Sequence, residues 1–328
     1  MDFRNESPWE AELVRSVLSP DESEPLLAIC VVKITYDILP DGSLRLSEEQ
    51  LPVATAPEDT DLGWIPSDAV PQKPAFDVLV LGHARDPGGR PVPSMTVRLQ
   101  VGEEVRDLAV FGDRVWRQEE SGIRATDPEP FDEMPLTYAR AYGGTAKALE
   151  YETPYPWNPD GKGYVLEERY ADGSPLPNVE DPEARIATWA DQPTPAGFAP
   201  VPLASLFTVD RGVEISEDRS SQRVKPDVFQ AAHPRLVFPD VPPGTRIWLH
   251  GMGPEGRLGF AMPRVEARVE ASFDDERHPV DGRVDTLCVL ADEARCFVLH
   301  RSPFKYRMVP EQLRVTTLHV DDAGAPPP

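Results

Sequence analysis

Several short segments of the chain alternate between hydrophobic and polar residues with a period of two, which is the pattern of β-strands that bury one face. The first covers residues 26–38, where alternate positions from Val32 to Ile38 are apolar. The sequence Pro40-Asp41-Gly42 follows this segment and is typical of a tight turn. Together they predict a strand that enters a hairpin.

Three more segments in the first half of the chain have the same character. Residues 76–84 are apolar enough for a central strand, and residues 94–101 place apolar side chains on one face. Residues 104–116 are interpreted as a hairpin that turns at Gly112-Asp113. We therefore predict an N-terminal β lobe over residues 26–144, built as an antiparallel sandwich or barrel-like sheet.

Strand patterns resume after residue 234 and predict a C-terminal antiparallel β lobe over residues 231–320. Its clearest hairpin covers residues 284–301 and turns near residues 291–293. A flexible tail is expected at residues 321–328. The other strands of this lobe are expected at residues 246–250, 257–262, 264–272 and 312–320.

The first 25 residues predict a short N-terminal helix or arm. Ser7 suits the N-cap, Pro8 suits the first helical position, and Glu10 completes a Ser-x-x-Glu capping box. Apolar residues then recur on one helical face. This face packs on the body of the protein or docks a partner.

Residues 145–230 are rich in Pro, Gly, Asp and Asn, and the whole chain holds 38 prolines, about twice the ordinary share. A disordered linker would lack the aromatic residues found here. We predict an ordered, irregular connecting segment wrapped across the sheets, with a short helix that begins at Asp181-Pro182. The aromatic residues are Trp157, Tyr164, Trp189 and Phe198.

The net charge of the chain limits the classes of partner that we expect it to bind. The 328 residues include 33 basic and 56 acidic side chains, for a net charge of −23. This balance disfavours binding to nucleic acid or to an anionic membrane surface. The acidity either maintains solubility or complements a basic protein partner.

Cysteine content and targeting signals favour a cytoplasmic protein. Three cysteines are too few for a disulfide framework. The N-terminus lacks the basic start and apolar middle of a signal peptide. The longest apolar run, LLAICVV, is far shorter than the ~20 residues that span a bilayer. We expect neither export nor membrane insertion.

No motif predicts a cofactor, a metal or a catalytic residue. GMGPEG at residues 251–256 matches a dinucleotide fingerprint, but a strand-like segment follows it, so we predict a hairpin loop. In YPWNPDGKGY a calcium loop would begin at Pro156, which has no side-chain oxygen. This segment is instead predicted to be a packed turn anchored by Trp157 and Tyr164. Cys288 and Cys296 are expected to be small buried thiols.

The stretch PLTYARAYGG raises the question of a phosphate loop. Leu136, Tyr138 and Tyr142 at even spacing predict an extended segment with one aromatic face, followed by Gly143 and Gly144. Paired glycines permit positive φ or a close backbone approach. A phosphate loop would continue into a helix with Lys and Ser or Thr, and this segment does not. The structural interpretation is preferred.

The order of short motifs along residues 26–305 resembles the DUF2169 family of type VI secretion accessory proteins. The motifs are VVKITYDI, IPSDAVPQKPAFDVLVLGHA, VFGDRVW, PLTYARAYGG, NPDGKGY, LPNVED, PAGFAPVP and VDTLCV. The resemblance implies a cytoplasmic, non-catalytic adaptor or chaperone that helps to load secreted effectors onto the PAAR and VgrG proteins of the secretion spike. The chain departs from the family pattern over residues 203–235.

We therefore expect a binding protein with no cofactor. An aromatic, Gly/Pro-rich face would hold an effector or a PAAR–VgrG spike component, and exposed strand edges offer a second mode of binding by strand addition. Two alternatives stay open: a hydrolase that acts on carbohydrate or peptide through dispersed carboxylates, and an acidic neutraliser of a basic toxin. The candidate contact residues are Tyr138, Tyr142, Gly143, Gly144, Trp157, Asn158, Tyr164 and Asn178.

Overall fold

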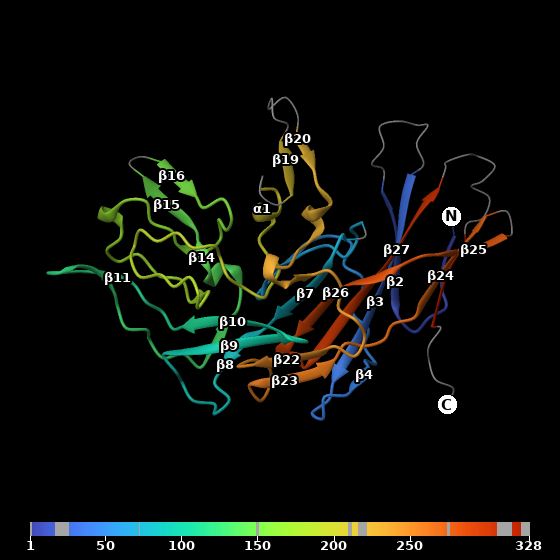
Figure 1. Ribbon diagram of the computed structural model, residues 1–328, viewed down its shortest axis with the longest axis horizontal. Coiled ribbons are helices and arrows are strands. Elements are labelled where there is room, and N and C mark those ends of the chain that lie inside the picture. The colour runs from blue at the N-terminus through green and yellow to red at the C-terminus, as the bar shows by residue number, and fades with distance from the viewer. Residues whose placement is uncertain are drawn as a thin grey trace.

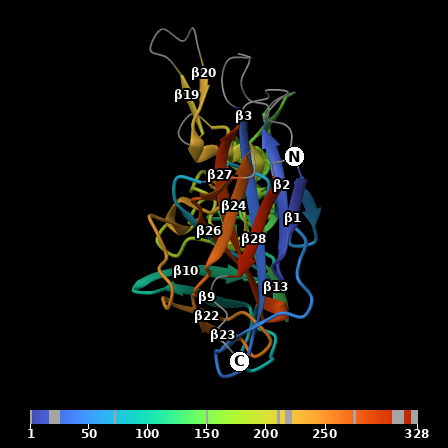
Figure 2. The same cartoon turned by 90° about the vertical axis from the view of Figure 1, so that its right-hand side faces the viewer.

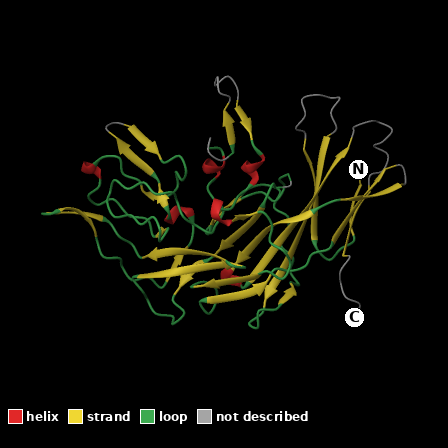
Figure 3. Ribbon diagram, in the orientation of Figure 1, coloured by secondary structure: helices red, strands yellow, loops and turns green. Residues whose placement is uncertain are grey.

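The computed structural model shows a mainly β protein with a few short helices (Figure 3). The fold class predicted from the alternating pattern is confirmed. No helix among the described residues is long and apolar enough to cross a membrane. The structure describes residues 2–16, 26–71, 73–148, 151–208, 212–215, 222–273, 276–306 and 317–322.

The largest sheet has seven strands and combines segments from both ends of the chain. β3 and β27 are paired in antiparallel register from Leu26 opposite Tyr306 to Asp37 opposite Arg295. The β lobes expected at residues 26–144 and 231–320 therefore share one sheet. Its order is β2 (Glu10–Ser16), β3 (Leu26–Ile38), β27 (Arg295–Tyr306), β26 (Arg283–Leu290), β7 (Phe76–Leu81) and β21 (Val237–Phe238), with β4 (Leu44–Leu46) paired to β3.

One strand pair in this sheet is parallel, which differs from the purely antiparallel lobes that we predicted. β7 and β26 run in the same direction, with Val78 opposite Leu287 and Val80 opposite Val289. These strands lie far apart in the sequence, so no hairpin turn forces them to be antiparallel. All residues of β7 are buried, which confirms its prediction as a central strand.

A second sheet of five strands crosses the first (Figure 1). Its order is β18 (Val179–Glu180), β10 (Glu104–Phe111), β9 (Ser94–Val101), β22 (Arg246–His250) and β23 (Arg257–Ala261). β22 and β23 form a hairpin around residues 251–256. The glycines of GMGPEG therefore lie in a hairpin loop, as predicted.

A third sheet joins the two ends of the chain on one side of the molecule (Figure 2). The strand expected at residues 312–320 is found in part as β28, and residues 312–316 lie outside the described residues. The predicted tail begins too early, because residues 321 and 322 belong to β28; residues 323–328 lie outside the described residues. The order of this sheet is β1 (Asp2–Asn5), β28 (Thr317–Asp322), β24 (Ala267–Phe273) and β25 (Glu276–Val280).

Small ladders and single helical turns make up the rest of the described chain. The described part of residues 145–230 contains only such short elements, which confirms the prediction of an irregular middle segment. The ladders are β5 (Glu58–Thr60) with β6 (Gly63–Ile65), β8 (His83–Arg85) with β13 (Glu133–Pro135), β11 (Trp116–Glu119) with β12 (Gly122–Ala125), β14 (Tyr142–Gly143) with β17 (Lys162–Gly163), β15 (Thr145–Ala148) with β16 (Tyr151–Pro154), and β19 (Val213–Ile215) with β20 (Gln222–Val224). The helices are α1 (Leu203–Leu206) and the 3-10 turns η1 (Tyr138–Arg140), η2 (Glu168–Tyr170), η3 (Pro226–Phe229), η4 (Pro234–Leu236) and η5 (Ala291–Glu293).

Side chains from the two large sheets form one hydrophobic core. Ile34, Val78 and Leu287 enter it from the seven-stranded sheet, and Leu99 and Ile247 enter it from the five-stranded sheet; all five are fully buried. The same region also holds charged groups that are paired, as buried charges must be. These buried ion pairs are Lys33 with Asp68, Lys73 with Asp77, and Arg301 with Asp285.

The predicted N-terminal helix is wrong, because residues 10–16 form strand β2 on the edge of β3. Trp9 and Ala11 are buried at alternate positions, so the same residues also fit a period of two. The hydroxyl of Ser7 accepts a hydrogen bond from the main-chain N–H of Trp9 at 3.3 Å, which is a local turn and not a helix cap. Pairing with the edge of β3 therefore stabilises the strand conformation over the helix.

Two other local predictions are wrong. β10 forms its hairpin with β9 through Gly102, while the N–H of Gly112 bonds to the oxygen of Pro93 and the chain then leaves the sheet. The segment at Asp181 is a turn without a helix, in which its carboxylate accepts a hydrogen bond from the N–H of Glu183 at 2.9 Å. Asp favours such turns as readily as helix starts.

Candidate functional site

The paired glycines of PLTYARAYGG form a close backbone contact with the loop after β16. Gly143 and Gly144 have φ values of +146° and +96°, which favour glycine. The N–H of Gly144 donates a hydrogen bond to the main-chain oxygen of Asn158 at 2.8 Å, and a Cβ atom on Gly143 would overlap that oxygen. The predicted positive φ and close approach are both confirmed, and a strand, β15, follows the pair.

Asn158 is fully buried and holds this loop to the preceding segment. Its side-chain Nδ2 donates hydrogen bonds to the main-chain oxygens of Tyr138 at 2.8 Å and Tyr142 at 2.9 Å. A Cβ atom on Gly161 would overlap the same side-chain amide. The segment that superficially resembled a calcium loop is thus a packed turn whose asparagine bonds to the backbone of the protein itself.

Three tyrosine rings pack against one another beside the glycine pair. The ring centroids of Tyr142 and Tyr155 are 5.1 Å apart, and those of Tyr155 and Tyr164 are 5.0 Å apart. Burial raises the pKa of the Tyr142 and Tyr155 hydroxyls above the ordinary value. These groups therefore stay protonated and act as packing residues.

Asn178 is fully buried and connects β10 to the connecting segment. Its Nδ2 donates hydrogen bonds to the oxygen of Phe111 and to the Asp113 carboxylate, each at 3.0 Å. This hydrogen bond, helped by the nearby Lys162 and Arg140 cations, lowers the pKa of the Asp113 carboxyl group. The arrangement fixes the two chain segments against each other.

The structure thus separates the candidate contact residues into two groups. Tyr138 is one of six buried candidates that carry packing or backbone hydrogen bonds, and it alone among them lines one of the two grooves described below. The six are Tyr138, Tyr142, Gly143, Gly144, Asn158 and Asn178. Trp157 and Tyr164 are half-buried. The rigid aromatic platform that we predicted is therefore largely internal.

A groove of about 510 Å³, the apolar groove, opens where Tyr138 and Trp157 meet the segment after β18. The Tyr138 side chain lines this groove although the residue is only 7% exposed. The volume is within the range of ligand and peptide pockets. The groove is lined by Pro74, Ala75, Tyr138, Trp157, Thr194, Pro195, Val201, Ser205, Asp227, Gln230, His233, Pro234 and Val237.

The segment that contributes Val201 and Ser205 to this groove also carries two exposed, large apolar side chains. Leu203 and Phe207 are 49% and 53% exposed on and just after α1, whose Ser205 lines the groove. Their spacing of four residues places them on one side of the helical turn. Clustered exposed apolar residues beside a groove are typical of a protein interaction site.

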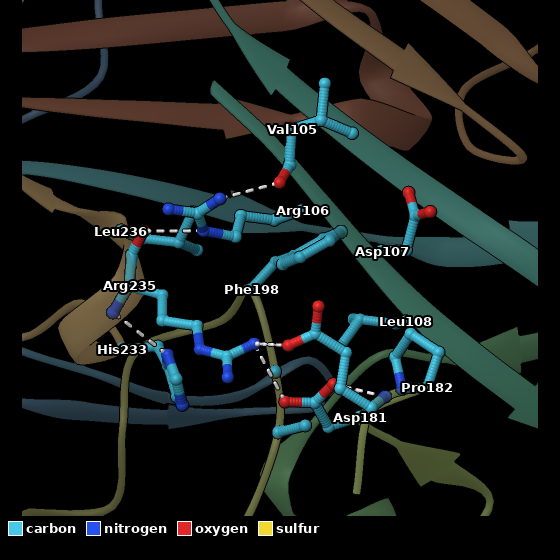
Figure 4. Close-up of a pocket in the computed structure, with 13 residues that line it drawn as sticks. Val105, Arg106, Asp107, Leu108, Asp181, Pro182, Phe198, His233, Arg235 and Leu236 are labelled. Carbon is cyan, nitrogen blue, oxygen red and sulfur yellow. Dashed lines mark hydrogen bonds and ion pairs between the residues drawn. The ribbon is translucent and has the colours of Figure 1, made fainter.

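A second groove of about 320 Å³, the β10 groove, lies beside the edge of β10 (Figure 4). Residues 105–108 form one wall, and Asp181, Glu183 and Arg235 form the opposite wall. The Arg235 guanidinium binds the Asp181 and Glu183 carboxylates at 3.0 and 3.1 Å. His233 lines both grooves, so the two sites are neighbours.

Burial and hydrogen bonds account for the pKa shifts of the described thiol and aspartate groups. Asp227 is the one carboxylate in the lining of the apolar groove. Burial raises the pKa of the Cys30 and Cys288 thiols to about 12 and also raises that of the Cys296 thiol. Cys288 and Cys296 are thus the small buried thiols that we predicted, and Cys30 is buried as well. Hydrogen bonds lower the pKa of each carboxyl group with a resolved shift, namely Asp37, Asp41, Asp107, Asp113 and Asp191. Within the described residues, no cluster of three His, Cys, Asp or Glu could hold a metal ion.

Sequence reasoning found two lining residues of the apolar groove, Tyr138 and Trp157, and missed the others. Several of these are prolines and small residues in the segment after residue 190, where the only available signal was composition. Arg106 and Arg235 of the β10 groove were also missed, because charged residues in a strand or a turn are ordinarily solvated.

Comparison with known proteins identifies one family. The family described as "Uncharacterized protein conserved in bacteria (DUF2169)" matches residues 24–301. This range includes every residue that lines the two grooves. No curated protein matches the chain, and no solved structure matches it.

Proposed function

The chain belongs to the DUF2169 family, and from this premise we propose that it is a non-catalytic adaptor of a type VI secretion system. It binds a secreted effector or the PAAR and VgrG proteins of the spike in the cytoplasm and assists their loading. The observation that carries this proposal is the apolar groove together with the exposed Leu203 and Phe207.

The shape and lining of the apolar groove suit a polypeptide better than a reactive small molecule. Trp157 and Tyr138 offer flat, rigid rings, which contribute contact area at a low cost in conformational entropy. The prolines in the lining are equally rigid. A site of this kind binds apolar side chains of a partner without a conformational change of its own.

Charge supports a protein partner of basic character. The chain has a net charge of −23, which accelerates association with a positively charged surface. The apolar groove itself contributes Asp227 to this field. Apolar contact in the groove and acidic surroundings together fit an effector segment that combines both properties.

The proposal can be tested by affinity purification from a secreting cell, with the partner identified by mass spectrometry. Wild-type protein should enrich a secreted toxin or a spike protein. Trp157→Ala should reduce that enrichment at least about tenfold, because buried Trp residues dominate protein interfaces. Trp248→Ala is the matched control, since Trp248 is 38% exposed on β22 of the five-stranded sheet; it should retain the partner.

A second variant separates binding from folding. Leu203→Asp combined with Phe207→Asp changes only exposed side chains, so the thermal midpoint should stay within a few degrees of wild type. Loss of the partner with an unchanged midpoint supports the proposal. Retention of the partner by both the Trp157 and the double variant overturns the assignment of the apolar groove, and enrichment of no effector or spike protein overturns the function.

The net charge also favours a second candidate, an acidic neutraliser that covers a basic toxin. Binding through charge alone weakens steeply as salt rises, whereas binding through an apolar groove does not. Affinity measured across a salt series therefore distinguishes the two functions.

A further inference from the structure

The strand β10 has one edge that the described strands cover only in part. Along one side it pairs with β9 over its full length, from Glu104 opposite Val101 to Phe111 opposite Ser94. Along the other side it pairs with the two-residue β18, at Ala109 and Val110. No described strand pairs with this side of β10 between residues 104 and 108.

The main-chain groups of Val105 and Asp107 face this open side. The N–H of Phe111 bonds to Asn178 beside β18, whereas the N–H of Gly112 bonds to Pro93 beside β9. Because main-chain groups alternate between the two sides of a strand, the odd-numbered residues of β10 direct their N–H and C=O away from β9. The main-chain N–H and C=O groups of Val105 and Asp107 therefore face the β10 groove, where they could pair with an added strand.

The Arg106 side chain bonds to a main-chain oxygen that a neighbouring strand would otherwise use. Nη1 of Arg106 donates a hydrogen bond to the main-chain oxygen of Val105 at 2.7 Å. Figure 4 shows the Arg106 side chain extending from β10 toward Leu236. Its Nη2 is paired with Glu104, whose side chain is 57% exposed, and its Nε donates a hydrogen bond to the main-chain oxygen of Arg235 at 3.3 Å. An added strand would replace these contacts, of which the exposed ion pair contributes little.

The β10 groove is small and has an acidic wall opposite the open edge of β10. Its volume is about 320 Å³, near the lower limit for ligand sites. Asp181 and Glu183 stand opposite the edge and are bound to Arg235. The groove between this wall and Val105 is the space that an added strand would occupy.

The charges beside the edge favour a positively charged occupant. Arg235 already binds the Asp181 and Glu183 carboxylates, so one cation is shared by two anions. The carboxylates around the groove outnumber the guanidinium groups, and the whole chain has a net charge of −23. The carboxylates are Glu104, Asp107, Asp181 and Glu183; the guanidinium groups are those of Arg98, Arg106 and Arg235.

We propose that the open edge of β10 binds an extended, basic segment of the partner polypeptide as an added strand. This inference rests on the adaptor function proposed above and identifies a second contact surface beside the apolar groove. Main-chain hydrogen bonds to Val105 and Asp107 supply the affinity, as in other cases of strand addition. The acidic wall at Asp181 and Glu183 selects for Lys and Arg.

The test uses the full chain and a synthetic peptide that alternates Lys and Thr. A second peptide of the same sequence carries N-methyl groups on alternate amides, which removes the donors of strand pairing and leaves the charge unchanged. A third replaces Lys by Glu. The Lys-Thr peptide should bind at least about tenfold more tightly than either control, and hydrogen exchange of the Val105 and Asp107 amides should slow when it binds.

Two protein variants locate the site. Val105→Pro removes an N–H that faces the groove and leaves the hydrogen bonds to β9 in place, so it should weaken peptide binding at least about tenfold. Val105→Ala trims the side chain, keeps the N–H and should bind within about twofold of wild type. The N-methylated peptide gives an independent result on wild-type protein if the proline variant does not fold.

Equal binding of the N-methylated peptide would overturn the proposal, because it would show charge attraction without strand pairing. Protection confined to other amides would overturn it as well. Self-association that Val105→Pro abolishes would assign the edge to a second copy of the chain. If Val105→Pro retains the cellular partner and Trp157→Ala loses it, strand addition fails while the adaptor function stands; peptide binding at β10 without any effector or spike partner gives the reverse result.

Discussion

The main-chain oxygen of Asn158 lies so close to Gly143 that it would overlap a Cβ atom on that residue. The contact is between two backbones, so no side-chain rotation can relieve it. Next to it, the N–H of Gly144 bonds to the same oxygen at 2.8 Å. One peptide group therefore fixes the distance between the glycine pair and the loop that carries Trp157.

Gly143→Ala should lower the free energy of unfolding by roughly 2–4 kcal/mol, because it adds both a steric overlap and an unfavourable φ. Gly122→Ala is the matched control, with φ of +116° and no atom near its added Cβ. The control should cost about 1 kcal/mol, the contribution of φ alone. Chemical denaturation measures both, and equal losses would contradict the close-contact explanation.

Asp77→Ala should destabilise the protein by about 3–5 kcal/mol, because it leaves the buried Lys73 cation without its carboxylate. The Asp77 carboxylate accepts hydrogen bonds from Lys73 Nζ at 2.6 Å, from Gln230 Nε2 at 2.6 Å and from the N–H of Ala231 at 2.8 Å. Arg45→Ala breaks an exposed pair with Asp37 and should cost only about 0–1 kcal/mol. Urea midpoints for the two variants check the contrast.

His300 should make the protein less stable as the pH falls below neutrality. Burial lowers its pKa to about 4, with the nearby Arg301 contributing and Asp285 opposing, while the unfolded chain titrates near 6.5. The unfolded state therefore binds the proton first, and up to about 3 kcal/mol of stability is lost between pH 6.5 and pH 4.

A pH series of unfolding measurements checks this dependence. His300→Gln should flatten the profile over that range, whereas His250→Gln should preserve it, since His250 is exposed on β22. A wild-type profile that stays flat from pH 6.5 to 4 would contradict the buried, neutral state of His300.

The thiols should not react with a thiol reagent such as dithionitrobenzoate in the folded protein. Cys30, Cys288 and Cys296 are all buried, and burial raises the pKa of each thiol. Reagent access and thiolate formation are therefore both suppressed. Three thiols per chain should appear in guanidinium chloride, and rapid labelling of any one under native conditions would contradict its placement.

The strands were predictable where one face is buried and the other is wet, as at Val97 and Leu99 of β9. Pairing between distant segments was not, because the apolar run of β7 does not state which strand will lie beside it. The N-terminal segment shows the limit of local signals. Its sequence matches a helix capping box at Ser7, but pairing with β3 makes the segment a strand.

The candidate site was predicted only in part, for a related reason. Aromatic residues such as Tyr142 serve both cores and interfaces, and the sequence does not distinguish the two. The apolar groove brings together residues as far apart as Pro74 and Val237. Such a site forms only when the chain folds, so the spacing of these residues in the sequence does not predict it.

The pairing of β3 with β27 also bears on how the protein is made. When β3 leaves the ribosome, β2 and the nearby β4 can pair with it, but β27, its neighbour on the other edge, has not yet been translated. That edge of β3 stays uncovered until residues 295–306 have emerged. The nascent chain must therefore carry a long apolar strand through most of its synthesis, and its final structure can be reached only late. Ribosome-bound chains that stop before Arg295 should remain sensitive to protease.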